Sequence, residues 1–363
     1  MKKVFVFITQ MEPGGAQMAA IKLMRGLTKR GYNAKIFFLY SKRPIPGIPI
    51  QFRVLTTYKP KHLWFFPVLL FQLFKVLKKE KPDTVISFTY YANIMTQLVA
   101  FLTGVSSRIA SQRSVRNGYP FIAKILDQLL GTLGIYTHNI MVSKTAMDSF
   151  KNCPKAYKRR FSVVYNGIMP EQGNTVPWNL REKIDTIREK DSIIISVGRL
   201  SYPKNHQILI RALENLPSVH FVLIGEGELH NELIKLAIEK KIEKRFTILP
   251  EVKNDDVIGI VSQGDIFVFP SLYEGMSNSL IEALFANIPI LASNIPSNKE
   301  VLCENADDQP GNLLSSNDVF AWQNAISSIL GDQAKRDDLV KQARRLSKRF
   351  TIDKMIQGFE NVI

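Results

Sequence analysis

Cysteine is almost missing from this chain of 363 residues, since only Cys153 and Cys303 occur and they lie far apart. Two isolated cysteines form neither a disulfide framework nor a metal-binding spacing, so we expect reduced thiols in a cytoplasmic protein. No Asp-x-Asp sequence occurs, and the five histidines show no ligand spacing. Paired aspartates and clustered histidines are typical of divalent-metal sites. The sequence therefore predicts no metal ion.

Acidic residues are scarce in the first half of the chain. Residues 1–170 hold 26 Lys and Arg against 5 Asp and Glu, a net charge of +21. Residues 171–363 hold 22 against 27, a net charge of −5, and the two add up to the net charge of +16 of the whole chain. Such a basic body suggests a polyanionic partner: nucleic acid, an anionic membrane face or a phosphorylated substrate. The alternative is that basic residues only keep the protein soluble. Nucleic acid is disfavoured, because no recognised nucleic-acid motif or single-strand platform occurs.

Long hydrophobic segments are missing as well. The start, Met1-Lys-Lys followed by apolar residues 4–8, resembles a signal peptide but is too short and lacks a small-residue cleavage site, so it predicts a first strand. The aromatic, base-flanked segment 62–79 is too short to span a bilayer. It predicts a helix that either packs on the sheet or lies at a membrane interface, with Phe65 and Phe66 in the headgroup zone and lysines on anionic lipid. Both alternatives are true if one face of the helix packs on the sheet and the other face meets lipid.

The organisation that remains is an alternation of strands and helices. A chain of this length is expected to form two domains. Short β-rich runs alternate with helical segments in both halves, which favours parallel βαβ units and an α/β fold of two doubly wound domains. The predicted strands are 3–9, 34–40, 84–88, 108–111, 139–142, 192–197, 220–224, 246–249, 266–270 and 289–292, and the clearest helices are 17–30, 205–215, 228–240 and 277–286.

The domain junction is predicted just after Asn166-Gly167, a turn signal that precedes the polar segment 170–179. We expect a first domain over 1–168 and a second over 169–345. The last segment, 346–363, is expected to be helical and could cross back to the first domain.

The most informative motif is Glu274-Gly-Met-Ser-Asn-Ser-Leu-Ile-Glu282, which follows a strand-like run. Strand, tight loop and helix start form the place where an open α/β sheet binds its ligand. A helix beginning near Ser277 would point free N–H groups at an anion. Eight residues of helix rise about 12 Å, so the two carboxylates could hold hydroxyls at opposite ends of a sugar–diphosphate–ribose ligand.

A second motif, Gly198-Arg-Leu-Ser-Tyr-Pro-Lys204-Asn205, follows the strand 192–197. Arg199 and Lys204 on one loop could clamp a diphosphate and stabilise it as a leaving group; the alternative is two surface cations. Gly14-Gly15 and Gly225-Glu-Gly227 also follow strands, and glycines let a backbone approach a phosphate closely. Each pair alone is equally well explained by a plain turn.

Together these motifs resemble the retaining glycosyltransferases of family 4, which have the two-domain GT-B fold. The resemblance covers most of the chain and is carried by Gly198-Arg-Leu with Lys204-Asn, by Gly225-Glu-Gly227, and by Pro270-Ser-Leu-Tyr-Glu274-Gly with Glu282 beyond it. The segments 86–93 and 111–113 resemble a subgroup that acts on bacterial surface glycans and lipid-linked sugars. The resemblance implies two Rossmann-like domains that face each other across a cleft.

The resemblance also implies roles for individual residues. Arg199 and Lys204 would bind the donor diphosphate, Glu274 would contact the donor hexose, and Glu282 would hold the ribose hydroxyls. The remaining donor-binding positions are Gly14, Gly15, Gly225, Val252 near the base, Gly275, Met276 and Ser277. Many family members have a histidine at the end of the fourth strand, where this chain has Ser87-Phe-Thr-Tyr90. Thr89, Tyr90 and Arg113 are therefore the acceptor-side candidates.

We therefore expect a metal-independent hexosyltransferase that retains the anomeric configuration and needs no cofactor beyond its nucleotide-sugar co-substrate. It would move a hexose or N-acetylhexosamine from a UDP-sugar to a lipid-linked, lipopolysaccharide or polysaccharide acceptor. We expect it in the cytoplasm, bound peripherally to the anionic inner face of the plasma membrane, with no nucleic-acid partner. The alternatives are a nucleotide-sugar epimerase and a non-catalytic sugar-nucleotide-binding subunit of a glycan-assembly complex.

Overall fold

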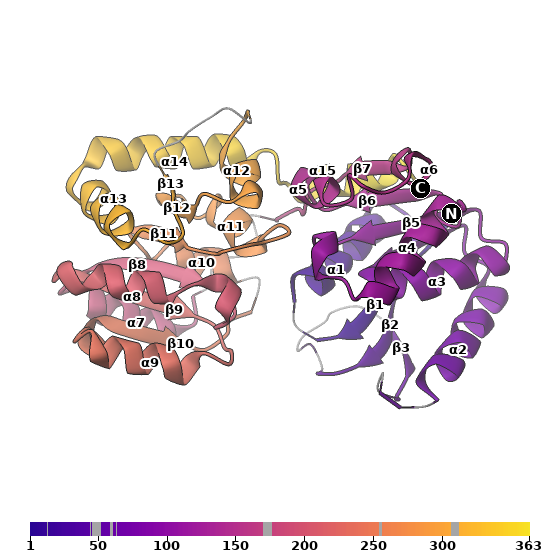
Figure 1. The fold of residues 1–363 in the computed structure, drawn as a ribbon, viewed down its shortest axis with the longest axis horizontal. Helices are drawn as coiled ribbons and strands as arrows, with labels where there is room; N and C mark the ends of the chain where they lie inside the picture. Colours follow the sequence, from indigo (N-terminus) through magenta and orange to yellow (C-terminus); the bar gives the residue numbers. More distant parts are fainter. Residues whose placement is uncertain are drawn as a thin grey trace. The chain divides into compact units, whose positions relative to one another are not determined.

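The computed structural model describes residues 1–12, 14–43, 45, 52–58, 61–62, 64–169, 176–253, 256–305 and 312–363. The chain divides into two compact units (Figure 1). Unit 1 comprises Met1–Gly167 and Phe350–Ile363, and unit 2 comprises Ile168–Arg349. Residues 170–175 of the polar segment predicted at the junction lie outside the described residues.

Unit 1 is built on a parallel sheet with the strand order β3-β2-β1-β4-β5-β6-β7. The five strands predicted in this part of the chain are confirmed, with small changes at their ends. The two strands that the sequence did not reveal, β3 and β7, lie at the sheet edges, where partial exposure weakens the apolar pattern. The strands are β1 (Lys3–Met11), β2 (Asn33–Ser41), β3 (Phe52–Thr56), β4 (Thr84–Phe88), β5 (Ser107–Gln112), β6 (His138–Met141) and β7 (Phe161–Val163).

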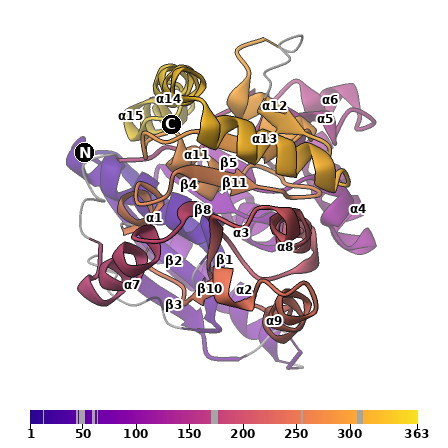
Figure 2. The same cartoon turned by 90° about the vertical axis from the view of Figure 1, so that its left-hand side faces the viewer.

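Helices cover both faces of this sheet (Figures 1 and 2). On one face, α1 (Gly15–Lys29) and α15 (Ile352–Glu360) share a core with the side chains of Val4, Val6 and Ile8. On the other face, α2 (Phe65–Glu80), α3 (Tyr90–Leu102) and α4 (Phe121–Thr132) lie in a row, with α3 touching both neighbours. The shorter helices of unit 1 are α5 (Lys144–Asp148) and α6 (Lys155–Lys158).

Helix α2 corrects one expectation. Phe65 is 2% exposed and packs in the core with Tyr40, while Phe66 is 48% exposed. Neighbouring residues of a helix point about 100° apart, so only one of these two phenylalanines can face the sheet. The prediction that both enter a lipid headgroup zone is wrong for Phe65.

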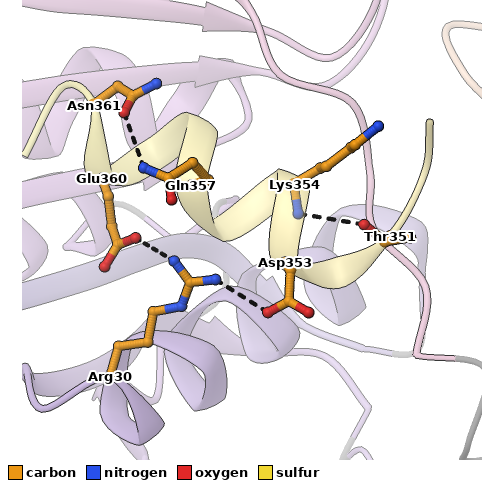
Figure 3. A network of polar contacts seen from close by, with 7 residues as sticks. All are labelled: Arg30, Thr351, Asp353, Lys354, Gln357, Glu360 and Asn361. Carbon is orange, nitrogen blue, oxygen red and sulfur yellow. Dashed lines mark hydrogen bonds and ion pairs between the residues drawn. The ribbon is translucent and has the colours of Figure 1, made fainter. Parts of the chain in front are cut away.

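The C-terminal helix α15 is fixed to α1 by apolar contacts and by ion pairs, and Figure 3 shows the ion pairs. Met355, Ile356 and Phe359 are buried in the core that α1 covers. Arg30, which follows α1, forms ion pairs with Asp353, at 3.0 Å, and with Glu360. The segment Phe350–Ile363 therefore belongs to unit 1, although it follows unit 2 in the chain.

Unit 2 is built on a second parallel sheet, with the order β10-β9-β8-β11-β12-β13. The five strands predicted here are confirmed. The edge strand β13 was not predicted, because two residues give no periodic signal. The strands are β8 (Ser192–Val197), β9 (Val219–Ile224), β10 (Phe246–Leu249), β11 (Ile266–Phe269), β12 (Ile290–Ser293) and β13 (Leu313–Leu314). The helices are α7 (Trp178–Arg188), α8 (Gln207–Ala212), α9 (His230–Glu239), α10 (Val257–Val261), α11 (Asn278–Ala283), α12 (Pro296–Leu302), α13 (Val319–Gly331) and α14 (Gln333–Ser347).

The strand order has a direct consequence for ligand binding. In each sheet the first strand of the unit is central, and the chain reverses direction across the sheet beside it, between β1 and β4 and between β8 and β11. Open α/β sheets bind ligands outside the carboxyl ends of the strands at such a switch point. Both units are thus doubly wound, as predicted. No helix in the described ranges is long and apolar enough to cross a lipid bilayer.

Candidate active site

Three loops of unit 2 leave the sheet side by side at its switch point. Strand β8 pairs with β9 and with β11, and all three run parallel, so their carboxyl ends meet at one edge. The loops that follow them begin at Gly198, Gly225 and Pro270. These are the loops on which the sequence placed the donor site.

The loop after β8 is tied to the loop after β11 by backbone and side-chain hydrogen bonds. The Leu272 N–H donates to the Pro203 carbonyl at 2.8 Å, and Asn205 Nδ2 donates to the Pro270 carbonyl at 3.3 Å. Asn205 has a left-handed backbone with φ 53°, which asparagine tolerates better than most residues. The Gly198-to-Asn205 segment is therefore held in one conformation against the loop that carries Glu274.

The centre of this arrangement is an ion pair between the two motifs. Lys204 Nζ lies 2.6 Å from Glu274 Oε1, and the two side chains are only 17% and 16% exposed. Ser271 Oγ donates to the same carboxylate oxygen at 3.1 Å, and Lys204 Nζ lies 4.8 Å from the ring centre of Phe269. In a partly desolvated site, a fixed cation of this kind acts more strongly on an incoming anion than it would in water.

Arg199 differs from Lys204 in its surroundings. Its side chain is exposed, and it forms no ion pair with any residue that the structure describes. The structure places it on the same loop as Lys204, five residues earlier, directly after Gly198. The Arg199 guanidinium is therefore a cation on this loop that no ion pair with a described carboxylate neutralises.

The glycines of Gly225-Glu-Gly227 have a packing role that the sequence left open. Gly225 has a φ of 146°, and a Cβ atom there would collide with the carbonyl oxygen of Gly198. A Cβ atom at Gly227 would likewise collide with the carbonyl oxygen of Leu200. Leu200 N–H donates to the Glu226 carbonyl at 2.9 Å across the same contact. These glycines let the loop after β9 lie directly against the backbone of the Arg199 loop.

The segment from Glu274 to Glu282 is helical only in its second half. Helix α11 covers only Asn278–Ala283, so the rise of 12 Å expected from eight helical residues does not apply. Ser277 is the N-cap of this helix, so the helix begins near Ser277 as predicted, although it ends before residue 286; Ser277 is 6% exposed. Glu282 lies on α11 and is 5% exposed, whereas Gly275 and Met276 are partly exposed in the loop. Val252 is partly exposed and follows β10, which pairs with β9, so its loop leaves the same edge of the sheet.

In unit 1 the predicted residues also follow strands at the switch point. Gly14 is the N-cap of α1 after β1, and Gly15 is the first residue of that helix. Thr89 follows β4, where its Oγ1 lies 2.5 Å from Thr9 Oγ1 of β1. Its φ of 75° and ψ of 151° fall in a region that is almost restricted to glycine. A β-branched residue in this conformation is an outlier of the kind that collects at functional sites.

Tyr90 and Arg113 have partners within unit 1. The Tyr90 ring lies 4.6 Å from the Tyr119 ring, and burial raises the pKa of its phenol. Arg113 follows β5; it donates to Asn166 and, at 3.3 Å, to Ser111 Oγ. Burial lowers the pKa of Arg113 to about 9, so the guanidinium keeps its charge at neutral pH. Among the described residues its partners are an amide, a hydroxyl and the Phe88 ring, and none of them is a carboxylate.

Two polar side chains at these edges were not predicted as site residues. Ser271 contacts Glu274, and Thr9 contacts Thr89. Each lies within two residues of the carboxyl end of a strand next to the switch point, which is the signal that could have found them. Within the described ranges, no group of three or more His, Cys, Asp or Glu side chains is placed to hold a metal ion.

Family models match both units of the chain. The model described as glycosyltransferase family 4 matches residues 13–172. The model described as glycosyl transferases group 1 matches residues 179–346, which contain Arg199, Lys204, Glu274 and Glu282.

Curated proteins and solved structures give similar results. An Escherichia coli UDP-Gal:alpha-D-GlcNAc-diphosphoundecaprenol alpha-1,3-galactosyltransferase is 29% identical over 73% of this chain and 70% of its own. The Campylobacter jejuni N-acetylgalactosamine-N,N'-diacetylbacillosaminyl-diphospho-undecaprenol 4-alpha-N-acetylgalactosaminyltransferase is 24% identical over 96% of each chain. Anabaena HepE, solved in complex with UDP and glucose, superposes with a TM-score of 0.83 over 99% of each chain at 17% identity.

Proposed function

This chain belongs to the glycosyltransferases of family 4 and has the GT-B fold, and we propose that it is a retaining enzyme that uses a UDP-sugar. The sugar would be a hexose or an N-acetylhexosamine, and the acceptor would be a lipid-linked, lipopolysaccharide or polysaccharide glycan. The observation that carries the proposal is the Lys204–Glu274 pair at the switch point of unit 2, beside the exposed cation of Arg199.

The choice of donor rests on charge and on likeness. Lys204 and Arg199 offer the positive charge that a nucleoside diphosphate needs, so the site would work without a metal ion. The E. coli relative carries UDP-Gal in its name, and Anabaena HepE was solved with UDP. Both similarities support UDP over other nucleotides as the carrier.

Each of the four charged residues of the site would have its own part in the reaction. Lys204 and Arg199 would bind the diphosphate and stabilise the charge that develops as it leaves. Glu274, held by Ser271 and Lys204, would accept hydrogen bonds from hydroxyls of the donor sugar. Glu282 would hold the ribose hydroxyls.

Retention would follow from attack on the same face from which the diphosphate departs. The acceptor oxygen would bond to the anomeric carbon while the bond from that carbon to the diphosphate oxygen breaks. The acceptor proton would pass to the departing diphosphate, giving UDP. No protein base is needed for this step, so catalysis would rest on positioning and on electrostatic stabilisation.

The acceptor and the location are supported by the relatives and by charge. Two relatives are named for diphosphoundecaprenol-linked acceptors, which are lipids with an anionic head. The residues 1–170 that include most of unit 1 carry a net charge of +21. We propose that the enzyme acts as a peripheral protein at the cytoplasmic face of the plasma membrane.

A thermal-shift screen against UDP-, GDP- and ADP-sugars in EDTA tests the donor site. A ligand that binds only the folded state stabilises it by about 2.7 kcal/mol at 100 times its Kd. We expect a shift with UDP-sugars, present without metal and lost in Glu282→Gln. Glu239→Gln, at an exposed position on α9, is the matched control and should keep the shift.

The screen has outcomes that would contradict the proposal. No shift with any nucleotide, from a sample that melts cooperatively, would remove the donor role of unit 2. If chromatography of the same samples showed that the UDP-sugar is converted to an isomer without any acceptor, the protein would be an epimerase.

A further inference from the structure

Helix α4 exposes a continuous apolar stripe. The residues at i, i+1, i+4, i+5 and i+8 of a helix lie on one side of it, and in α4 all five are large, apolar and 39% to 76% exposed. Leu133, just beyond the helix, extends the stripe and is 68% exposed. The five are Phe121, Ile122, Ile125, Leu126 and Leu129.

Helix α2 repeats this pattern at the same spacing. Phe66, Leu70, Phe71 and Phe74 are 38% to 64% exposed, and Trp64 at the start of the helix is 58% exposed. The opposite side of α2 carries Phe65, Leu69 and Leu73, which are buried against the sheet. Soluble proteins rarely expose so many large apolar side chains together, and such a patch marks an interaction site.

The two stripes lie on the outer sides of helices that cover the same face of the sheet. Helices α2 and α4 lie on either side of α3, which contacts both, and each buries its other side in the core beneath. Between them, α3 exposes Phe101 and Leu102. Figure 1 shows α2, α3 and α4 grouped on this side of unit 1.

The charges on these helices favour anions. Lys75, Lys78 and Lys79 are exposed on α2. The helices carry only two carboxylates, and neither is available to repel an anion. Glu80 pairs with Lys35 at 3.0 Å, and Asp127 is 1% exposed and accepts hydrogen bonds from Tyr157 and Gln112.

We propose that α2, α3 and α4 form a docking surface for an anionic lipid bilayer, in which the stripe of α4 enters the headgroup region together with that of α2. This inference rests on the proposed function, because a lipid-linked acceptor is reached at a membrane. Apolar side chains combined with flanking lysines and no available carboxylate match the interfacial zone of anionic lipids, where aromatic rings sit at headgroup level and lysines meet lipid phosphates.

Co-sedimentation with vesicles of phosphatidylglycerol and of phosphatidylcholine tests the surface. We expect the protein to bind phosphatidylglycerol vesicles, with binding that weakens as salt rises. The triple variant Ile122→Ser/Ile125→Ser/Leu129→Ser should lower the partition coefficient more than about tenfold. Its matched control, Trp178→Ser/Ile238→Ser/Phe320→Ser, removes apolar side chains of unit 2 that are 58% to 76% exposed, and it should bind as the unchanged protein does.

Charge reversal tests the lysines separately. Each lysine near an anionic surface strengthens binding about fivefold. The variant Lys75→Glu/Lys78→Glu should therefore reduce binding to phosphatidylglycerol vesicles by more than about fivefold. The control Lys183→Glu/Lys190→Glu changes two exposed lysines of unit 2 and should have a much smaller effect.

Two results would overturn the proposal. Unchanged vesicle binding by the α4 triple variant, with an unchanged melting temperature, would mean that lipid does not meet this surface. A dimer in light scattering that the triple variant converts to a monomer would make a second copy of the chain the occupant. The UDP-sugar thermal shift is measured on the same samples, so a failed donor site and a failed docking surface give different results.

Discussion

Lys204 Nζ lies 2.6 Å from Glu274 Oε1, although the two residues are 70 positions apart in the chain. The contact joins the loop after β8 to the loop after β11, across the switch point of the unit 2 sheet. It gives Glu274 a fixed position before any sugar hydroxyl reaches it. It also leaves the Lys204 ammonium partly neutralised, so in the proposed donor site the exposed Arg199 would supply much of the positive charge for a diphosphate.

Lys204→Met is expected to lower kcat/KM by about 10²–10³, which is the usual cost of removing one donor that stabilises a developing anion. The variant also leaves the mostly buried Glu274 carboxylate without its cation, which destabilises the fold by about 1–3 kcal/mol. The double variant Lys204→Met/Glu274→Leu also removes the unpaired carboxylate, so it should recover stability but not activity. Denaturant melts and steady-state rates measure the two effects. Activity restored in the double variant would contradict the catalytic role of the pair.

Thr89 is expected to store backbone strain, because its φ of 75° and ψ of 151° suit glycine alone. Thr89→Gly and Thr89→Ala both remove the hydroxyl that contacts Thr9, but only glycine relieves the strain. Thr89→Gly should therefore be more stable than Thr89→Ala by about 1–3 kcal/mol. This order reverses the usual one, in which glycine loses more conformational entropy on folding. Urea unfolding of both variants measures the difference. If Thr89→Gly were as stable as Thr89→Ala or less stable, the backbone at this position would be unstrained.

The strand ends could be predicted from the sequence because turn residues mark them. Gly198 and Pro270 end apolar runs, and the structure places both where β8 and β11 end. The Lys204–Glu274 contact could not be predicted, because it depends on β8 lying next to β11, and strand order is not encoded in local periodicity. The short edge strands β3, β7 and β13 were missed for the related reason that few of their residues are buried.

The exposed apolar stripes of α2 and α4 show a different limit of prediction from sequence. An apolar run such as residues 62–79 predicts a helix but does not say which side the sheet will cover. Phe65 and Phe66 are chemically identical, yet one is in the core and the other is half-exposed. The stripe of α4 was not predicted at all, since an apolar segment in an α/β chain is normally explained by burial. Only the packing of α3 against its neighbours shows which sides remain outside.

Gly225→Ala is expected to disturb the contact between the loops after β8 and β9. A Cβ atom at this position meets the carbonyl oxygen of Gly198, and the φ of 146° is unfavourable for any other residue. We expect a loss of about 2–4 kcal/mol in unfolding free energy, since both strain and overpacking contribute. Gly331→Ala is the control, because a Cβ atom there meets nothing within 4 Å. Equal melting temperatures for the two variants would show that the loop after β9 can move away from Gly198 without cost.

His206 gives a prediction for pH. It follows Asn205 in the loop after β8, is 3% exposed, and has a pKa lowered to about 3 by burial and, secondarily, by the charge of Lys204. In the unfolded chain this histidine is protonated below about pH 6.5. In the folded chain it stays neutral until the pH approaches 3. The unfolded state therefore binds more protons, and stability is full above pH 6.5 and falls as the pH decreases toward 3.

The slope that His206 adds is at most about 1.4 kcal/mol per pH unit. His206→Asn should flatten the fall in unfolding free energy between pH 6.5 and 4, measured by urea melts at several pH values. His230→Asn, at an exposed position on α9, is the matched control and should keep the slope of the unchanged protein. If His206→Asn kept that slope as well, the folded donor loop would admit a proton to His206, and the tight packing of this loop against β11 would not hold in solution.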